Sequence, residues 1–362
     1  MRKLASIKTI RSIIPIPEKD RIELAMIDGW QVIVKKGEFT VGSQCVYCEI
    51  DSIMPQTEQF EFLRGKNFRI KTMKMAGVIS QGICFPLSIL PPGDYKPEQD
   101  VTSIIGVKQY EETMDKEDSN VVCKPATKAK YPQWLMRFEW FRQMAYKQNH
   151  RECKGFPSFI SKTDEIRIQN IPSILSDKSK YVVTEKIDGQ SGSFCLVKRK
   201  RKFSFLPSKY EYIVCSRNLR LYSKNSSSYW QVSDKYNIEN ALHQLIDKDE
   251  WIAIQGECIA PGVQGNKYKV TEPDLYVFNV IKPTGRLGSI EAKAICESVG
   301  LKFVPILDKD FILPNSVEEM LNYAHARSEI GETLREGVVI RSQDGRKSFK
   351  TVDPLFLLKY DE

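Results

Sequence analysis

The sequence predicts an α+β protein of two domains, the first of which is a small β-barrel. The chain has 362 residues, which exceeds one typical domain and makes two domains with a connecting segment the natural expectation. Short strand candidates broken by turn residues fill the first part of the chain, and a helical pattern follows near its middle. Hydrophobic residues make up 41% of the chain, which is enough for ordinary cores.

Residues 1–110 are predicted to form an OB-like barrel. Strand candidates cover 29–34, 44–50, 68–72 and 77–86, with turn residues between them. Several short strands with irregular loops favour an OB-like barrel over a sandwich of long strands. Its basic residues either bind nucleic acid or form a solvated edge, and both remain open for Arg64, Lys66, Arg69, Lys71 and Lys74.

The composition favours an anionic partner and a reducing compartment. The formal net charge is +8 and 28% of the residues are charged, which suits nucleic acid as a partner. Nine cysteines are scattered along a chain that has no apolar N-terminal segment, so the thiols are expected to be reduced. No run approaches the roughly 20 apolar residues that span a bilayer. We therefore expect a soluble intracellular protein with no membrane contact and no obligate protein partner.

Residues 111–155 are predicted to be a linker followed by a helix. The segment opens with a run rich in acidic residues, which fits an exposed linker. Pro132 then begins a helix whose apolar stripe is expected to dock on a domain; it consists of Trp134, Phe138, Phe141 and Ala145. The second domain is accordingly expected to cover residues 156–362.

One stretch, residues 181–189, is central to the second domain. It begins with β-forming residues, so a short strand is expected that stops at Gly189. Side chains alternate along an extended chain, which puts Lys186 and Asp188 on one face. A lysine is a covalent nucleophile only when its amine is unprotonated, which burial or a nearby cation favours, and Asp188 could hold such a cation. A surface strand with an ion pair would give the same short pattern.

Four stretches further along the chain indicate how residues 181–189 are to be interpreted. They are Cys215-Ser-Arg-Asn218, Ile254-Gln-Gly-Glu257, Glu336-Gly-Val-Val-Ile-Arg341, and Ser348-Phe-Lys350 leading to Leu357-Leu-Lys359. Together with the lysine stretch they resemble, in order, the five motifs of the covalent nucleotidyltransferase superfamily, which comprises ATP-dependent ligases and mRNA-capping enzymes. The resemblance implies a nucleotidyltransferase (ATP-grasp-like ligase) domain of antiparallel sheets with flanking helices, here an adenylyltransferase domain.

The resemblance also implies a role for each motif, because phosphoryl transfer is stabilised mainly by positioned cations and metal. The implied catalytic residues, with AMP carried on the first, are Lys186, Asp188, Glu257, Glu336 and Lys350. The implied nucleotide contacts are Glu185, Ile187, Arg217, Phe278, Lys350 and Lys359. Phe278 would stack on the base, although a core phenylalanine fits as well. Mg²⁺ or Mn²⁺ would lie near Asp188, Glu257 and Glu336, in part through water, and substrate phosphate near Lys162, Arg167 and Arg217.

The last motif and the order of the domains indicate which branch of this superfamily the chain resembles. Some RNA ligases end with Lys-x-Lys, whereas this chain has Lys350-Thr-Val352, so the second lysine is missing unless Lys359 supplies it. DNA ligases and capping enzymes place an OB domain after the final motif, but here the chain ends at Glu362 and the β-rich module comes first. Residues 162–170 also resemble a segment of one branch of ATP-dependent RNA ligases, in which an OB domain precedes the catalytic domain.

The expected function is ATP-dependent sealing of RNA with 3′-OH and 5′-phosphate ends, typically at nicks in duplex, through lysyl-AMP and an RNA-adenylate. A GTP-dependent capping-type transferase and a catalytically silent RNA-binding protein are the alternatives. The first step needs only the nucleotide pocket, so a chain starting near Val121 is expected to adenylylate itself but to bind and seal nicked duplex poorly.

Overall fold

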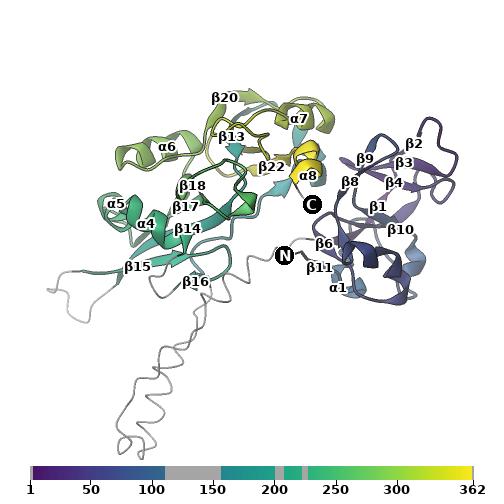
Figure 1. Cartoon of the computed structure of the whole chain (residues 1–362), viewed down its shortest axis with the longest axis horizontal. Coiled ribbons are helices and arrows are strands. Elements are labelled where there is room, and N and C mark those ends of the chain that lie inside the picture. Colours follow the sequence, from purple (N-terminus) through teal and green to yellow (C-terminus); the bar gives the residue numbers. More distant parts are fainter. Residues whose placement is uncertain (1–2, 111–155, 200–207, 222–226, 361–362) are drawn as a thin grey trace, which may run out of the picture.

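The protein folds as a small barrel beside a larger domain of two sheets (Figure 1). The computed structural model describes residues 3–110, 156–199, 208–221 and 227–360. The predicted linker and helix of residues 111–155 lie outside the described residues.

The barrel is built from short strands, as predicted. Its elements are β1 (Ala5–Thr9), β2 (Ser12–Pro15), β3 (Ile22–Ile27), β4 (Trp30–Lys35), β5 (Gln44–Cys48), β6 (Ser52–Ile53), η1 (Glu58–Lys66), β7 (Arg69–Ile70), β8 (Thr72–Met75), β9 (Val78–Gln81), β10 (Ile83–Phe85), η2 (Leu87–Ile89), α1 (Thr102–Ile105) and β11 (Lys108–Gln109). The strand expected over 77–86 is two strands, because Gly82 has a left-handed φ of 97° and a Cβ there would lie 2.4 Å from the Tyr47 ring. Trp30, Tyr47 and Phe60 fill the core.

The larger domain contains a five-stranded and a six-stranded sheet. Its elements are β12 (Ile166–Arg167), η4 (Ile168–Asn170), η5 (Pro172–Ser176), β13 (Lys180–Lys186), β14 (Gln190–Arg199), β15 (Lys209–Cys215), β16 (Arg220–Leu221), α4 (Ser228–Lys235), α5 (Ile238–Leu245), β17 (Trp251–Ile259), η6 (Gln264–Asn266), β18 (Asp274–Lys282), β19 (Gly285–Arg286), α6 (Ser289–Ser298), β20 (Ile306–Ile312), α7 (Val317–Ala324), β21 (Gly337–Ser342), β22 (Ser348–Val352) and α8 (Pro354–Tyr360).

Helices cover the outer faces of these sheets and leave the inner faces for a site. The six-stranded sheet has the order β16-β15-β14-β17-β18-β19, and its apolar outer face packs against α4, α5 and α6. The five-stranded sheet has the order β12-β22-β21-β13-β20 and packs against α7. The pairs are antiparallel apart from β12 with β22, which is parallel. None of the described helices is long and apolar enough to cross a membrane.

The barrel docks on the larger domain through short polar contacts with η4. Trp30 Nε1 donates to Asn170 Oδ1 at 2.6 Å, and Asn170 Nδ2 donates to Glu49 Oε1 at 2.8 Å. The backbone N–H of Gly29 donates to the Gln169 carbonyl at 3.2 Å. A Cβ on Gly29 would lie 2.7 Å from the Gln169 Cα, so a glycine is needed for the two backbones to approach this closely.

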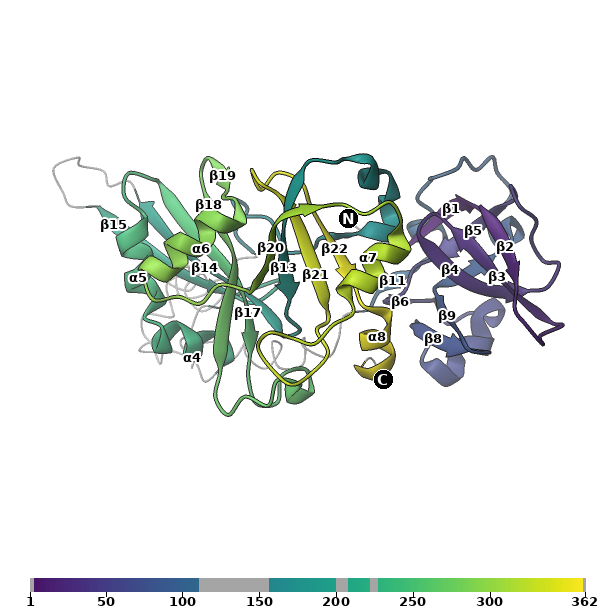
Figure 2. The same ribbon diagram turned by 90° about the horizontal axis from the view of Figure 1, so that it is seen from above.

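The C-terminal helix α8 makes the second contact between the domains. It lies on the side of the larger domain that faces the barrel in both views (Figures 1 and 2). Leu357 on this helix packs against the barrel core. The strand β22, which carries Lys350, ends at Val352, and α8 begins at Pro354. Only one residue therefore separates this strand from the helix that contacts the barrel.

Candidate active site

A cavity of about 430 Å³ lies between the inner faces of the two sheets, with barrel residues on one side. Of the twelve residues given catalytic, nucleotide, metal or phosphate roles from the sequence, eleven line it: Lys162, Arg167, Glu185, Lys186, Ile187, Asp188, Arg217, Glu257, Phe278, Glu336 and Lys350. Lys359 does not line the cavity; it is on the exposed side of α8, with its ammonium 4.8 Å from the Tyr360 ring. The structure therefore brings four distant motifs to the lysine stretch.

Lys186 is the last residue of β13, between β20 and β21 in the five-stranded sheet. It pairs in register with Gly337, which places its ammonium in an ion pair with Glu336, the residue just before β21. The strand stops at Lys186, earlier than expected, and the chain turns into β14 through Gly189. A Cβ on Gly189 would lie 2.5 Å from the Cys258 carbonyl oxygen, so the turn requires glycine.

Three carboxylates surround this amine and set its charge. Burial, the largest single effect, lowers the pKa of Lys186, but Glu336, Glu257 and Asp188 outweigh it and hold that pKa above the usual value. Burial raises the pKa of Glu257 to about 8, against the charge of Lys186. Burial and then the charge of Glu336 raise the pKa of Asp188 to about 6. Burial therefore favours the neutral form of Asp188 and Glu257, while the charge of Lys186 opposes this effect on both.

Glu257 and Glu185 are each tied to a different part of the chain. Glu257 Oε1 accepts a hydrogen bond from the Gly189 N–H at 3.1 Å, so β17 fixes the turn after the lysine. The carboxylate of Glu185 accepts hydrogen bonds from the Ser328 hydroxyl and, at 2.8 Å, from the Glu329 N–H. Burial raises the pKa of Glu185. Glu257 therefore supports the lysine turn, and Glu185 anchors a neighbouring loop.

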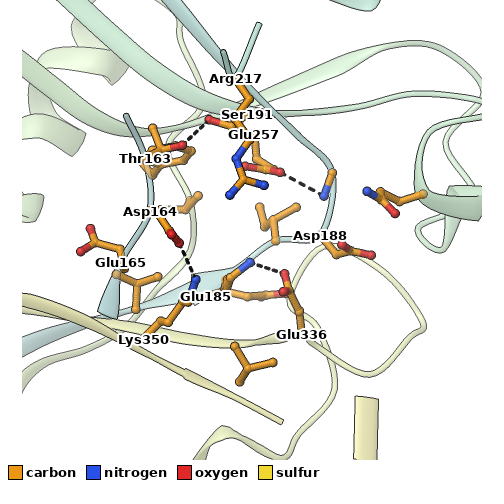
Figure 3. A pocket seen from close by; sticks show the side chains of 18 of the residues that line it. Thr163, Asp164, Glu165, Glu185, Asp188, Ser191, Arg217, Glu257, Glu336 and Lys350 are labelled. Carbon is orange, nitrogen blue, oxygen red and sulfur yellow. Dashed lines mark hydrogen bonds and ion pairs between the residues drawn. The ribbon is translucent and has the colours of Figure 1, made fainter. Parts of the chain in front are cut away.

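Cations gather on the side of the cavity nearest the barrel. Lys350 Nζ donates to Asp164 Oδ1 at 3.0 Å (Figure 3). The parallel pairing of β12 with β22 puts Arg167 next to Lys350. Burial lowers the pKa of Lys350 to about 8, although Asp164 opposes the shift. Arg167 is 6% exposed, and its Nε and Nη1 have no hydrogen-bond partner within the part of the chain that the structure describes. Its Nη2 donates to Asp51 of the barrel at 3.0 Å.

The barrel contributes four residues to the cavity wall: Asp51, Arg69, Gln109 and Tyr110. Arg69 is 7% exposed, its Nη2 lies 3.5 Å from Asp51, and its guanidinium lies 3.7 Å from the Tyr110 ring centre. The sequence left open whether Arg69 binds nucleic acid or belongs to a basic edge open to solvent. Its burial instead makes it part of the domain interface, a position that no local sequence pattern indicates.

A β-bulge directs two consecutive side chains of β18 into the cavity. Gln255 pairs with Asn279, whereas the next residue, Gly256, pairs with Val277, so Phe278 is the extra residue. The apolar outer-face residues of this strand are accordingly Leu275, Val277 and Val280, which breaks strict alternation. Phe278 and Asn279 both line the cavity.

Lys267 is a cavity residue that the sequence motifs missed. Its ammonium forms an ion pair with Asp188, and the neighbouring Tyr268 hydroxyl accepts a hydrogen bond from the Asp188 N–H at 2.9 Å. The Lys267 side chain is 12% exposed. It follows η6 in a loop that carries no recognisable motif, so only the folded structure reveals its position.

Comparison with known proteins agrees with this arrangement. A family model described as RNA ligase matches residues 179–360, and a model described as an OB-fold domain matches residues 4–87. The chain belongs to the RNA ligase family. The predicted family, the enzyme class and the order of an N-terminal OB-fold domain before an α+β domain are confirmed.

Solved structures similar to this RNA ligase come from Naegleria gruberi. A mutant of that organism's RNA ligase with ATP and Mn is 30% identical over 100% of both chains, with a TM-score of 0.79. The same ligase with pyrophosphate is 30% identical over 100% of this chain and 99% of that one, with a TM-score of 0.79. A mutant with AMP and Mn is 29% identical over 99% of each chain, with a TM-score of 0.78. No curated protein matches the chain.

Proposed function

We propose that this RNA ligase uses ATP to join 3′-OH and 5′-phosphate RNA ends, preferentially at nicks in duplex, through AMP bound to Lys186. The observation that supports this most is the position of the Lys186 amine: it lies in the cavity, paired with Glu336 and near Glu257 and Asp188, with Lys350 close enough to affect its charge. The Naegleria gruberi ligase with ATP and Mn supports the choice of nucleotide and metal.

The reaction has three steps, and in each step one bond to phosphorus forms while another breaks. Lys186 Nζ attacks the α-phosphorus of ATP, and the bond to the β-phosphate oxygen breaks to release pyrophosphate. An oxygen of the RNA 5′-phosphate then attacks the same phosphorus, which frees Lys186 and gives an RNA-adenylate. The 3′-OH finally attacks the 5′-phosphorus, AMP leaves, and the hydroxyl proton is lost to the surroundings.

Lys186 must lose a proton before its first attack. As an ammonium it has no lone pair, and the carboxylates around it hold its pKa above the usual value. Glu336 already accepts a hydrogen bond from this ammonium, so it is the group placed to take or share the proton. Any added positive charge near the three carboxylates would lower the pKa of Lys186 and favour the free amine.

The donor set fits a hydrated divalent cation. Asp188, Glu257 and Glu336 are carboxylates, which are the ligands that Mg²⁺ and Mn²⁺ prefer, and all three raise the pKa of Lys186. A cation near them would favour the charged forms of Asp188 and Glu257, whose pKa values burial raises. Among the described residues no group of three or more His, Cys, Asp or Glu is arranged to hold a metal directly, and the contact that we propose is through water. When bound, the metal would supply positive charge to the phosphate oxygens.

We assign the remaining contacts by charge and shape. Lys350, Arg167 and Arg217 are cations on the cavity wall and would hold phosphate oxygens. Phe278 would stack on the adenine, because the bulge turns its ring toward the cavity, which Val304 and Val339 also line. Lys162, whose Nζ donates to Asn218 at 2.9 Å, is placed at the rim for the RNA phosphate. Glu185 and Ile187 flank Lys186 and would contact the nucleotide from the main chain.

We further propose that residues 1–110, 111–155 and 156–362 act as an OB-fold domain, a connecting segment and an adenylyltransferase domain. The net charge of +8 fits a long polyanion as the substrate. A nicked duplex suits a cavity whose wall is shared by two domains, because each domain can grip one side of the break.

Incubation with labelled ATP or GTP and Mg²⁺ or Mn²⁺ tests the proposal directly. We expect a covalent adduct with ATP that nicked RNA duplex discharges with formation of a sealed strand. An adduct with GTP alone would favour a capping-type transferase. The absence of any adduct would favour a silent RNA-binding protein.

A further inference from the structure

Two consecutive loop residues hold both the side chain and the backbone of Asp188. The Lys267 ammonium pairs with its carboxylate, and the Tyr268 hydroxyl accepts from its N–H at 2.9 Å. The two charged side chains are only 12% and 16% exposed, for Lys267 and Asp188 respectively. An ion pair that is exposed to water does little to hold its side chains in place. The pair of Lys267 and Asp188 is shielded from water, and Asp188 is held at both its carboxylate and its backbone N–H.

The C-terminal helix α8 holds Lys267 from the other side. The Lys267 ammonium lies 5.3 Å from the Phe356 ring centre and 5.4 Å from the Tyr360 ring centre, within the range of cation–π attraction. The Tyr360 hydroxyl is itself fixed at 2.8 Å from the Thr333 hydroxyl. Leu357, which lies between Phe356 and Tyr360 in the sequence, packs against the barrel core. One helix thus contacts both the barrel and the lysine that holds Asp188.

We propose that Lys267 is a positioning residue for the ligase reaction: it holds Asp188 in place two residues after Lys186, and α8 makes this contact depend on the docked barrel. The proposal rests on the proposed function of Lys186. Asp188 lies two residues after Lys186, in the turn between β13 and β14, so strand pairing does not fix its backbone. Lys267 and Tyr268 supply that support.

The position also gives the cavity a lysine that the motif pattern lacks. Val352 stands where some RNA ligases have the second lysine, and Lys359 is on the exposed side of α8. Lys267 reaches the cavity from a different loop and lies against α8, which begins two residues after Val352. A second lysine is therefore present in the cavity, beside Asp188, although the last motif provides only Lys350.

Single-turnover adenylylation by the full-length chain tests the role of Lys267. We expect Lys267→Met to lower the maximal rate about 10- to 100-fold with the KM for ATP nearly unchanged, because misplacing a neighbour of the reacting group affects the rate more than binding. Lys267→Arg keeps the positive charge and should recover most of the rate. Lys269→Met, an exposed lysine of the same loop, is the matched control and should behave as the unmodified protein.

Urea unfolding separates positioning from folding and does not depend on activity. We compare Lys267→Met, Asp188→Asn and the double variant without nucleotide. If the two groups contact each other, the double variant should unfold at a higher urea concentration than two independent losses would give. Additive losses of midpoint, or a Lys267→Arg rate as low as that of Lys267→Met, would overturn the proposal.

The link to the barrel is tested on α8 itself. Leu357→Ala should lower the adenylylation rate of the full chain, but should lower it no further when Lys267→Met is already present. Leu355→Ala, which is on the same helix and 41% exposed, is the control. Equal loss from Leu357→Ala in both backgrounds would reject the link. If the unmodified chain forms no adduct, the proposed function fails; if it labels and Lys267→Met labels equally, only this inference fails.

Discussion

Asp51 of the barrel accepts a hydrogen bond from Arg167 of the catalytic domain at 3.0 Å while its second oxygen lies 3.5 Å from Arg69. One carboxylate therefore contacts two buried guanidinium groups at the domain interface. We expect Asp51→Asn to lower the free energy of unfolding by about 1–3 kcal/mol, since it removes the negative charge from these two buried contacts. Urea unfolding of the full chain measures this.

A matched control for Asp51 lies on the barrel surface. Glu61 also pairs with an arginine, Arg64, but both side chains are more than half exposed, at 51% and 68%. Glu61→Gln should leave the unfolding midpoint unchanged, because exposed pairs contribute little. Equal destabilisation by the two variants would show that the interface position of Asp51 does not matter.

Lys186→Met should abolish the ATP adduct while the protein stays folded. The substitution removes the nucleophilic amine but keeps an apolar stem of similar length. Gel analysis of labelled protein measures the adduct, and circular dichroism checks the fold. Lys180→Met, at the exposed start of the same strand, should label normally. Retained labelling of Lys186→Met would assign the nucleophile to another residue.

The lowered pKa of Lys350, about 8, predicts that ATP binding takes up protons at alkaline pH. Above pH 8 the ligand-free amine is mostly neutral, and a bound phosphate restores its charge, so binding should draw in a proton and weaken as pH rises. Below about pH 7 the amine is already charged and no uptake is expected from it.

Calorimetry in buffers of different ionisation enthalpy measures this uptake. Binding is best followed in Lys186→Met protein, which forms no adduct. Adding Lys350→Arg should remove the alkaline proton uptake, because a guanidinium stays charged throughout this range. Unchanged uptake in the double variant would place the titrating group elsewhere.

Gly337→Ala should destabilise the catalytic domain and abolish adduct formation. A Cβ at Gly337 would lie 2.1 Å from the Thr351 carbonyl oxygen, so β21 and β22 would have to separate beside Lys186. Forced overpacking of this kind costs about 1–3 kcal/mol or more, which thermal unfolding can detect. Gly65→Ala, which meets no atom within 4 Å, should be tolerated.

The sequence predicted the parts of the fold that local patterns encode. Alternating β-formers indicated β4 and β13, and five ordered motifs indicated which distant residues meet, because each motif carries its own residue types. Strand ends were less predictable. The chain breaks at Gly82 and turns at Gly189 because of close approaches to Tyr47 and Cys258, and such approaches depend on residues remote in sequence.

Contacts between the domains could not be predicted from motifs. Arg69 and Asp51 belong to ordinary barrel strands and turns, yet they line the same cavity as Lys350. This changes one expectation. A chain starting near Val121 would lose part of the cavity wall and expose Leu357, so its self-adenylylation should be slower than the sequence suggested.

The extra residue in β18 has a consequence for how the enzyme can change over evolutionary time. Alternation along a strand acts as a reading frame, and the bulge at Phe278 shifts that frame by one. Deleting Phe278 would let Asn279 follow Val277 directly, so Asn279 would still face the cavity, Val280 would still face the outer core, and only the Phe278 side chain would be lost. A deletion in a regular stretch of the strand would instead turn every residue beyond it to the opposite face. We therefore expect this strand to tolerate a change of length at the bulge but not in its regular stretches.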